Sequence, residues 1–420
     1  MRVLHTSDWH LGKSLAGISR QPEHEAFCAE VVDLCEQSDV DVVLLTGDVF
    51  DTYNPPIAAE ELFFDTLARL GDGGRRAVVV IAGNHDSPDR LTTAVPLAAR
   101  HGVWILGHPG DAPAPQRLHR EGRVQLVGGG PNALHLGLPS GEEVVIAALP
   151  YPSEARFRRQ LTSSLDEHER QQAYSTYVGE LLEEPLHAAP PHAFRLAASH
   201  LAVRSCMPSE SERVLVGGAY QIDGRHLPAS AQYTALGHLH LAQQIPDAPA
   251  HAAYAGAPLA FRMSERDHDR AHRLVSLADP RAEPELEAIP IEAGRPLVVW
   301  EAEGVEEVVE GVEAGLHEGA IIELRLAVDR RLDHAAMARL QKLPRSFLRI
   351  RVDLPEARLE QVPPEVRHQL PPSELFQAFY REQTGLEPDP EVVALFVELL
   401  GPDAPATAPG RAASPHASAP

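Results

Sequence analysis

The chain has 420 residues, of which 44% are hydrophobic, so it is long enough for two or three globular domains with buried cores. Its formal net charge of −23 argues against a free-standing DNA-binding protein, because such proteins usually present a basic surface to the phosphates. If the substrate is a nucleic acid, metal ions or a partner protein must supply positive charge locally.

Two further classes of protein are excluded by simple patterns. No apolar run approaches the ~18 residues of a membrane span, and the first residues lack the apolar stretch of a signal peptide. Three cysteines are too few for a disulfide framework, which indicates a reducing compartment. Cys28 and Cys35 fall on an expected helix and are predicted to be ordinary core residues.

Apolar runs typical of buried strands alternate with helical stretches up to about residue 275, which indicates an α/β domain spanning residues 1–275. The expected helices span residues 23–37 and 58–70. The expected strands span residues 40–45, 77–82, 144–149, 194–198 and 233–236. Polar clusters begin where several of these strands end, which is where ligand sites form in open α/β sheets.

The rest of the chain has a different character. Strand candidates at 297–300, 321–328 and 347–352, with a helix candidate at 334–340, predict a small α+β domain over residues 276–352. Residues 353–370 are rich in proline and charge and predict a linker, and the tail at 402–420 is predicted to be disordered. Between them, residues 371–401 predict two helices, each with one apolar face.

The first two polar clusters contain three carboxylates and a histidine. Asp8 and His10 stand just past a strand, where both can turn toward one ion; a helix-capping aspartate beside a chance histidine is the alternative. Asp48 follows Gly47, which lets the chain turn sharply, and its two oxygens can bridge two cations, although an isolated Gly-Asp pair is commonly a simple turn. Asp51 is predicted to hold a ligand histidine by a hydrogen bond.

The third cluster runs from Gly83 to Asp86. The carboxamide oxygen of Asn84 suits a hard cation. His85 is predicted to face the substrate, where it can stabilise the transition state or protonate the leaving oxygen. Asp86 is expected to fix the tautomer of His85. A plain Asn-His turn between a strand and a helix is the alternative.

Histidines complete the predicted ligand set. His238 and His240 alternate in direction on an extended segment and can serve two different metals, with core packing as the alternative. His200 closely follows the apolar run 194–198 and is the best candidate for the remaining ligand. Oxygen and nitrogen ligands without cysteine suit Mn²⁺, with Mg²⁺, Fe or Zn²⁺ as other occupants. Two such ions activate water for phosphoester hydrolysis.

These clusters, in this order, resemble the calcineurin-like metallophosphoesterase superfamily. Longer segments resemble its SbcD family, the nuclease subunits of the bacterial SbcCD complex. These segments are 6–13, 47–52, 83–88, 209–218, 235–240, 256–259, 264–265 and 372–400. Ser199 departs from the pattern, since the family usually has glycine before this histidine.

The resemblance implies an α-β-β-α sandwich of two sheets with a small capping domain and a C-terminal helical segment that binds a partner. It implies that one metal is held by Asp8, His10, Asp48 and His240, the other by Asp48, Asn84, His200 and His238, with His85 catalytic. The implied partner contacts are Leu375, Phe376, Phe379, Tyr380, Leu395, Phe396 and Leu399.

The resemblance also implies a biological role. The family cleaves DNA ends and hairpins, typically with Mn²⁺, and works with the SbcC coiled-coil ATPase as a homodimer within a heterotetramer. The expected location is the cytoplasm, in association with the nucleoid. A phosphoesterase acting on a small substrate with the same metal site is the main alternative, and a scaffold with a decayed site is a second.

Basic and apolar residues near the motifs are candidates for contacts with other molecules. Lys13, Arg20 and Arg90 are candidate phosphate contacts, with solvated surface side chains as the equal alternative. The candidate dimer contacts, for which ordinary core packing is as plausible, are Leu62, Phe63, Phe64, Leu91 and Val95.

Overall fold

The computed structural model describes residues 1–113, 122–157, 166–209, 221–328, 332–353, 370–384 and 387–400. It divides into two compact units, Met1–Gly294 and Arg295–Pro420. Most of the predicted linker, the whole predicted tail and residues 210–218 of one family-like segment lie outside the described residues.

Two mixed sheets, each with parallel strands at its centre and antiparallel strands at one or both edges, form the first unit. The first sheet has the spatial order β17 (Glu285–Pro290), β16 (Ala271–Ser276), β1 (Arg2–Thr6), β4 (Val42–Thr46), β5 (Ala77–Ile81) and β6 (Val103–Leu106). The second has the order β14 (Gln243–Gln244), β15 (Ala252–Tyr254), β13 (Tyr233–Gly237), β10 (Phe194–His200), β9 (Glu143–Leu149), β8 (Ala133–Gly137) and β7 (Gln125–Gly130). The predicted strands are all present.

The central strands are apolar on both faces because both faces are covered. Every residue of β4 and β5 is buried, as expected for parallel strands in the middle of a layered domain. Leu44 and Val79 of the first sheet share one core with Ile146 and Leu196 of the second, so the two sheets pack face to face.

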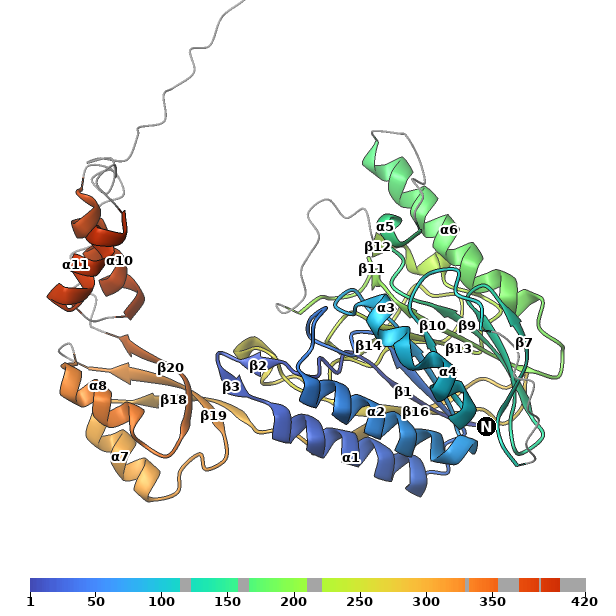
Figure 1. Ribbon diagram of the computed structural model, residues 1–420, viewed down its shortest axis with the longest axis horizontal. Coiled ribbons are helices and arrows are strands. Elements are labelled where there is room, and N and C mark those ends of the chain that lie inside the picture. The colour runs from blue at the N-terminus through green and yellow to red at the C-terminus, as the bar shows by residue number, and fades with distance from the viewer. Residues whose placement is uncertain are drawn as a thin grey trace, which may run out of the picture. The chain divides into compact units, whose positions relative to one another are not determined.

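Helices cover the two outer faces of this pair of sheets (Figure 1). The first sheet packs against α1 (Gln21–Gln37) and α2 (Ile57–Gly71), and the second packs against α6 (Glu167–His187). The predicted α-β-β-α sandwich is therefore confirmed. Cys28 and Cys35 are residues of α1 whose side chains lie in the core, where burial raises the pKa of both thiols to about 12.

The first unit continues past the predicted boundary at residue 275 and ends at Gly294. The reason is that β16 pairs with β1 and β17 pairs with β16, so both strands extend the first sheet at its edge. The sequence did not predict β17, because this edge strand is largely exposed and lacks the apolar run of the central strands.

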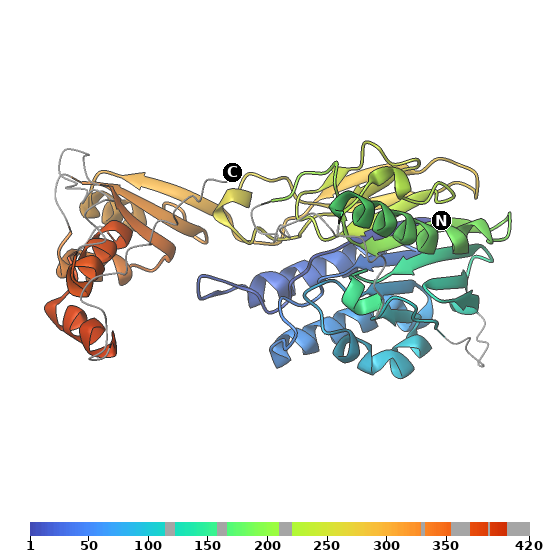
Figure 2. The same ribbon diagram turned by 90° about the horizontal axis from the view of Figure 1, so that it is seen from above.

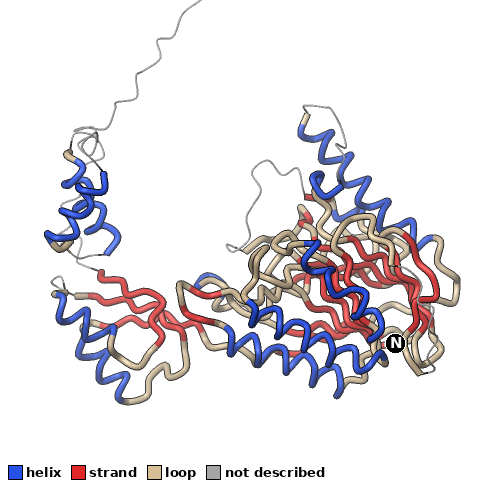
Figure 3. The backbone as a smooth tube through the Cα atoms, viewed as in Figure 1, coloured by secondary structure: helices blue, strands red, loops and turns tan. Residues whose placement is uncertain are grey.

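The second unit contains three parallel strands that alternate with two helices (Figure 3). The order is β18 (Leu297–Ala302), α7 (Val305–Glu313), β19 (Ile321–Ala327), α8 (His334–Gln341) and β20 (Ser346–Asp353). This alternation is an α/β topology rather than the expected α+β one. The difference arises from α7, which was not predicted: its buried residues are valines, which favour strands by propensity.

Helices α10 (Pro372–Thr384) and α11 (Pro390–Leu400) lie side by side (Figure 2). The rings of Phe376 and Phe396 stack with their centroids 4.1 Å apart and hold the pair together. Other residues of the predicted apolar faces are exposed, including Phe379 at 57% and Leu399 at 78%. None of the described helices is long and apolar enough to cross a membrane.

One buried histidine ties the two sheets together. His5 on β1 contacts the hydroxyl of Tyr233 at 2.9 Å and the carbonyl of Leu236 at 3.1 Å, both on β13. Burial lowers the pKa of His5 to about 3, with a smaller contribution from Arg273. His5 is therefore a structural residue that links the two sheets.

We expect His5 to make the fold sensitive to mild acid. The unfolded chain binds a proton at His5 near pH 6.5 but the folded chain does not, so stability is lost as the pH falls below 6.5. Between pH 7 and pH 5 this group should cost about 2 kcal/mol. Urea unfolding of the unsubstituted chain and of His5→Gln at both pH values measures it. The variant should lose less stability on acidification; equal losses would contradict the expectation.

Candidate metal centre

All seven predicted ligands lie at or just past the carboxyl ends of parallel strands. Asp8 and His10 follow β1, Asp48 follows β4, Asn84 follows β5, His200 ends β10, and His238 and His240 follow β13. Four come from the first sheet and three from the second. The face-to-face packing of the two sheets brings these strand ends together.

The first group contains Asp8, His10 and His240. Their ligand atoms lie within 4.8 Å of one another. The Nε2 atoms of His10 and His240 are 3.1 Å apart. Asp8 is held in place by the backbone N–H of His238, which donates to both of its carboxylate oxygens at 3.1 and 3.2 Å.

The second group meets at the carboxamide oxygen of Asn84. This Oδ1 lies 2.9 Å from His200 Nε2 and 2.8 Å from His238 Nδ1. The other ring nitrogen of His200 donates to the carbonyl of Thr46 at 2.8 Å. Since a carbonyl only accepts, Nδ1 carries a proton and His200 Nε2 is the nitrogen available to an ion.

Asp48 lies between the two groups. Its Oδ2 is 3.7 Å from His10 Nε2 on one side and 3.5 Å from His200 Nε2 on the other. Its Oδ1 accepts a hydrogen bond from the backbone N–H of His85 at 2.8 Å. This is the position that a carboxylate bridging two ions needs.

The spacing of these atoms fits divalent cations. Six ligands at about 2.1 Å around one ion place neighbouring ligand atoms about 3.0 Å apart. The closest contacts within the two groups are 3.1 Å in the first and 2.8–2.9 Å in the second. The donors are oxygen and imidazole nitrogen, and all belong to residues that are largely buried. The site therefore fits a pair of divalent metal ions.

Four of the predicted ligands have a strained backbone conformation. Asp8, His10, Asp48 and His238 have positive φ angles of 54°, 45°, 47° and 103°. Each such conformation costs a non-glycine residue of order 1 kcal/mol, and it persists only where the surroundings impose it. The strand-end turns are thus fixed by the geometry of the site.

Glycines precede three of the ligands because the strand ends approach closely. A Cβ atom on Gly47 would lie 2.3 Å from His200 Nδ1. One on Gly83 would lie 2.1 Å from Asp48 Oδ1, and one on Gly237 would lie 2.0 Å from the carbonyl of Thr46. No side chain fits at these positions, so the glycines do more than permit a turn.

Electrostatics set the protonation of the ligand imidazoles. Burial lowers the pKa of His10, and it lowers that of His238 to about 3, so both rings are neutral and able to bind metal. Burial also opposes protonation of His200, but the charge of Asp48 outweighs it and raises the pKa of His200 to about 9. Without metal, Asp48 and His200 form a buried ion pair.

Comparison with known proteins places this site in a family. Residues 1–213 match the family model described as calcineurin-like phosphoesterase. The chain is 38% identical over 403 residues to the SbcD subunit of the nuclease SbcCD from Bacillus subtilis, covering 95% of this chain and 97% of the relative. The chain belongs to the SbcD family of calcineurin-like phosphoesterases. It therefore binds divalent metal and is a metal-dependent phosphodiester hydrolase.

Other SbcD relatives extend the match. The chain is 29% identical to the SbcD protein of Rhodobacter capsulatus, over 90% of this chain and 94% of the relative. It is 28% identical to that of Escherichia coli K12, over 71% and 70%. Residues 293–384 match a model described as type 5 capsule protein repressor C-terminal domain, which begins where the first unit of this SbcD chain ends.

The surroundings of His85 differ from the prediction. His85 Nδ1 donates to the carbonyl of Asp51 at 2.8 Å, so that carbonyl, not the Asp86 carboxylate, fixes the tautomer. The prediction for Asp86 is therefore wrong: its carboxylate accepts from the backbone N–H groups of Val49, Phe50 and Gly83, and so ties the second and third clusters together. The Asp51 carboxylate was expected to hold a ligand histidine, and it lies 3.4 Å from Nδ1 of His10.

The three candidate phosphate contacts have three different environments. Arg20 is 1% exposed, and its guanidinium is fully engaged with Glu23 and the carbonyl of Ala260, so its prediction as a DNA contact is wrong. Lys13 pairs with Asp51 and is partly buried. Arg90 is exposed and pairs with Glu60 at 2.6 Å.

Of the candidate dimer contacts, Phe63 and Leu91 are core residues.

Four residues that border the site were not given a role from the sequence. The Tyr151 ring lies 6.1 Å from that of His200, and the Arg156 guanidinium covers Tyr151 and donates to the carbonyl of Asp86. Phe261 and Glu265 border the first group. Tyr151 lies two residues past the end of the apolar strand β9, as several predicted ligands lie just past their strands, and that position was the signal available. Ser199, the departure from the family pattern, donates to the carbonyl of Leu149 and leaves His200 in place.

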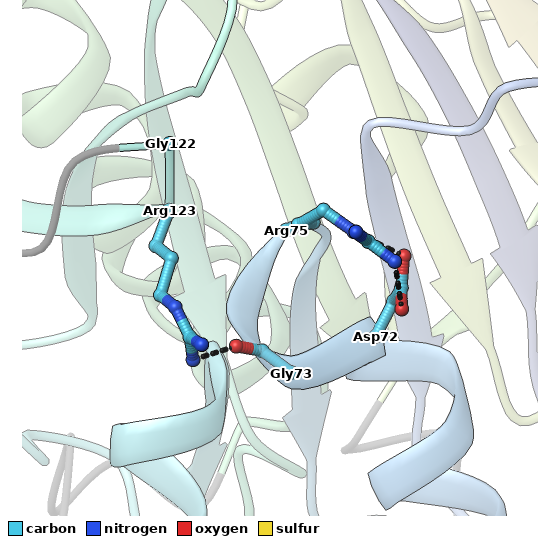
Figure 4. A pocket seen from close by; sticks show the side chains of 5 residues that line it. All are labelled: Asp72, Gly73, Arg75, Gly122 and Arg123. Atoms are coloured by element: carbon cyan, nitrogen blue, oxygen red, sulfur yellow. Dashed lines mark hydrogen bonds and ion pairs between the residues drawn. The ribbon is translucent and has the colours of Figure 1, made fainter.

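A surface hollow elsewhere is not part of this centre (Figure 4). It is lined by Asp72, Gly73, Arg75, Gly122 and Arg123, with Arg75 paired to Asp72 and Arg123 donating to the Gly73 carbonyl. Asp72 and Gly73 precede β5, whereas Asn84 follows it, so the hollow lies at the opposite end of the sheet from the ligands.

Adding a methyl group at Gly83 should displace Asp48 and disrupt the centre, and an unfolding midpoint measured beside the titration shows whether the chain still folds. In Gly83→Ala the new Cβ must push Asp48 away, and Mn²⁺ affinity should fall at least about tenfold, the usual cost of disturbing the residues around a metal. Isothermal titration of the metal-free protein measures it. Gly130→Ala, where a Cβ meets nothing within 4 Å, is the matched control. Unchanged affinity in Gly83→Ala would contradict the close approach.

Proposed function

We propose that this chain is the nuclease subunit of an ATP-dependent DNA-processing complex. The observation that carries the proposal is the position of Asp48 between two groups of oxygen and nitrogen ligands, in a chain of the SbcD family. The proposed reactions are exonuclease cleavage of double-stranded ends and endonuclease cleavage of single strands and hairpins. The substrates would arise during repair, recombination or replication.

The metal ligands and His85 divide the chemistry between them. When bound, a pair of divalent ions activates a water molecule and stabilises the attacking and leaving oxygens. One ion would be held by Asp8, His10, Asp48 and His240, and the other by Asp48, Asn84, His200 and His238. Mn²⁺ is the proposed occupant, with Mg²⁺ as the alternative.

His85 is proposed to act on the substrate itself. Its Nδ1–H is committed to the Asp51 carbonyl, which leaves Nε2 as the nitrogen that can hold or release a proton. The ring is half-buried, and its centroid lies 4.9 Å from that of His10. From there, Nε2 can donate to the leaving oxygen of the cleaved strand.

The C-terminal helices favour a macromolecular complex over a small-substrate phosphoesterase. Leu375, Phe379, Leu395 and Leu399 remain exposed on the α10–α11 pair. A hydrolase of small phosphoesters has no use for such a surface, whereas an SbcC-type coiled-coil ATPase would cover it. The proposed assembly is a homodimer of this chain within a heterotetramer, in the cytoplasm and associated with the nucleoid.

The partner would also explain how an acidic chain acts on DNA. With a net charge of −23, the chain needs the ATPase and the metal ions to supply positive charge near the phosphates. Arg90 and Lys13 remain candidate phosphate contacts, since both are at least partly accessible. We likewise propose that the second unit is a capping domain.

The decisive experiment is cleavage of an end-labelled hairpin duplex with Mn²⁺, with and without the ATPase partner and ATP. The unsubstituted chain should cut the hairpin, and partner plus ATP should stimulate it. His85→Ala should retain both Mn²⁺ ions while cleavage falls by roughly 10²–10⁴-fold, the usual contribution of a positioned proton donor.

Two outcomes would overturn these assignments. Loss of a metal ion in His85→Ala, measured by Mn²⁺ titration, would make His85 a ligand rather than a proton donor. Absence of DNA cleavage under every condition, together with rapid turnover of a small phosphoester, would establish the alternative activity.

The exposed face of α10 and α11 should be required for the complex. Introducing Leu395→Ser with Leu399→Ser should abolish co-purification with the ATPase while leaving turnover of a small model phosphodiester unchanged, as should deletion of residues 371–420. Leu316→Ser, which changes a 46% exposed leucine elsewhere in the same unit, is the matched control. Complex formation by the double variant would rule out this face as the partner site.

A further inference from the structure

A buried ionic network that the proposed reaction does not use lies directly behind the first ligand group. Its members are Arg20, Glu23, Ala260, Phe261 and Glu265, all nearly inaccessible to solvent, with Arg20 at 1% and Glu265 at 2%. Burying the Arg20–Glu23 ion pair and the Glu265 carboxylate costs free energy unless their contacts are made, so a network of this kind calls for an explanation.

The network starts at the beginning of α1. Arg20 makes a forked pair with Glu23, with its Nε 2.5 Å and its Nη2 2.7 Å from the two carboxylate oxygens. The remaining Nη1 donates to the carbonyl of Ala260 at 2.7 Å. The guanidinium thereby fixes the 260–265 segment to a helix that packs on the first sheet.

That segment forms one wall of the metal centre. The ring of Phe261 lies 5.1 Å from the ring of His10 and 5.5 Å from the ring of His240, in edge-to-face arrangements. Its backbone N–H donates to Glu265 Oε2 at 2.7 Å. Both ligand histidines are thus packed against a residue whose position depends on Arg20 and Glu265.

Glu265 faces the nitrogen of His240 that points away from the ligand group. His240 Nε2 is the atom 3.1 Å from His10, whereas its Nδ1 lies 3.6 Å from Glu265 Oε1. The distance exceeds that of a hydrogen bond, but the carboxylate charge still favours a proton on Nδ1. A proton there leaves the lone pair of Nε2 for the metal. Ser209 also donates to Oε1 at 2.9 Å, which helps to orient the carboxylate.

We propose that Glu265 is a positioning residue that holds His240 in its metal-binding tautomer, and that Arg20 supports it by fixing the segment between Ala260 and Glu265. Neither residue touches metal or DNA. The network therefore serves one of the two ions, the one that His10 and His240 would hold. This inference deepens the proposed function and rests on its metal centre.

The test is Glu265→Gln, a change of nearly equal size. The glutamine oxygen can still accept from Phe261, but its NH₂ group now faces His240 Nδ1 and favours the tautomer with the proton on Nε2. Titration of metal-free protein with Mn²⁺, followed by electron paramagnetic resonance of free Mn²⁺, should give one site weakened about 10–100-fold and the other unchanged. Unfolding midpoints in EDTA should be the same for variant and parent.

A second histidine–glutamate pair, with a buried histidine and a partly exposed glutamate, is available as a control. Glu30 lies 3.0 Å from Nε2 of His272, and that pair lies away from the ligands, where α1 meets β16 and the end of the first unit. Glu30→Gln should leave both Mn²⁺ sites intact. Arg20→Lys, which keeps the charge but loses the fork, should weaken the same single site as Glu265→Gln, and it tests the proposal if the glutamine variant does not fold.

The alternative outcomes are distinct. Two unchanged Mn²⁺ sites in Glu265→Gln, or two sites weakened equally, would overturn the positioning role, since it predicts a loss at one ion only. Absence of Mn²⁺ binding by the parent chain would overturn the proposed metal centre, and this inference with it.

Discussion

The whole active region depends on the face-to-face packing of two sheets whose parallel strands end on the same side. Each sheet alone contributes only part of a ligand set. Asp8, Asp48 and Asn84 leave the first sheet, and His200 and His238 leave the second. The Asn84 oxygen lies 2.8–2.9 Å from both histidines, and Asp48 Oδ2 lies 3.5 Å from His200 Nε2. The apolar core shared by the two sheets therefore holds the predicted ligands in place. Several of these residues adopt strained, positive φ angles at the strand ends, and this conformation directs their side chains into the site.

The sequence predicted this arrangement well because two simple signals agreed. Buried parallel strands are continuous apolar runs, and a polar cluster after such a run marks the functional edge of a sheet. His200 was found by position alone, from the end of its strand, and it lies within 2.9 Å of the Asn84 oxygen. Gly47 was interpreted as permitting a sharp turn, but at Gly47, Gly83 and Gly237 alike a Cβ atom would clash with a neighbouring strand end.

The failures of prediction have physical causes as well. Arg20 beside a motif was read as a phosphate contact, because sequence does not reveal that Glu23 and a carbonyl 240 residues away take up its hydrogen bonds. Asp86 was assigned to its neighbour His85, but its carboxylate binds backbone amides of another loop. The edge strand β17 lacks the apolar run of a buried strand, and helix α7 has helical spacing but buries valines, which favour strands. Long-range hydrogen bonding and edge position are not local properties.

The split of the ligands between two distant parts of the chain has a consequence during synthesis. Asp8 emerges from the ribosome long before His238 and His240, and the second sheet must be complete before the histidines can meet the aspartates. A nascent or truncated chain that ends before these histidines lacks part of both ligand groups, so it should not cut DNA. The complete set of predicted ligands therefore exists only after the chain has been synthesised as far as His240, although the first unit continues to Gly294.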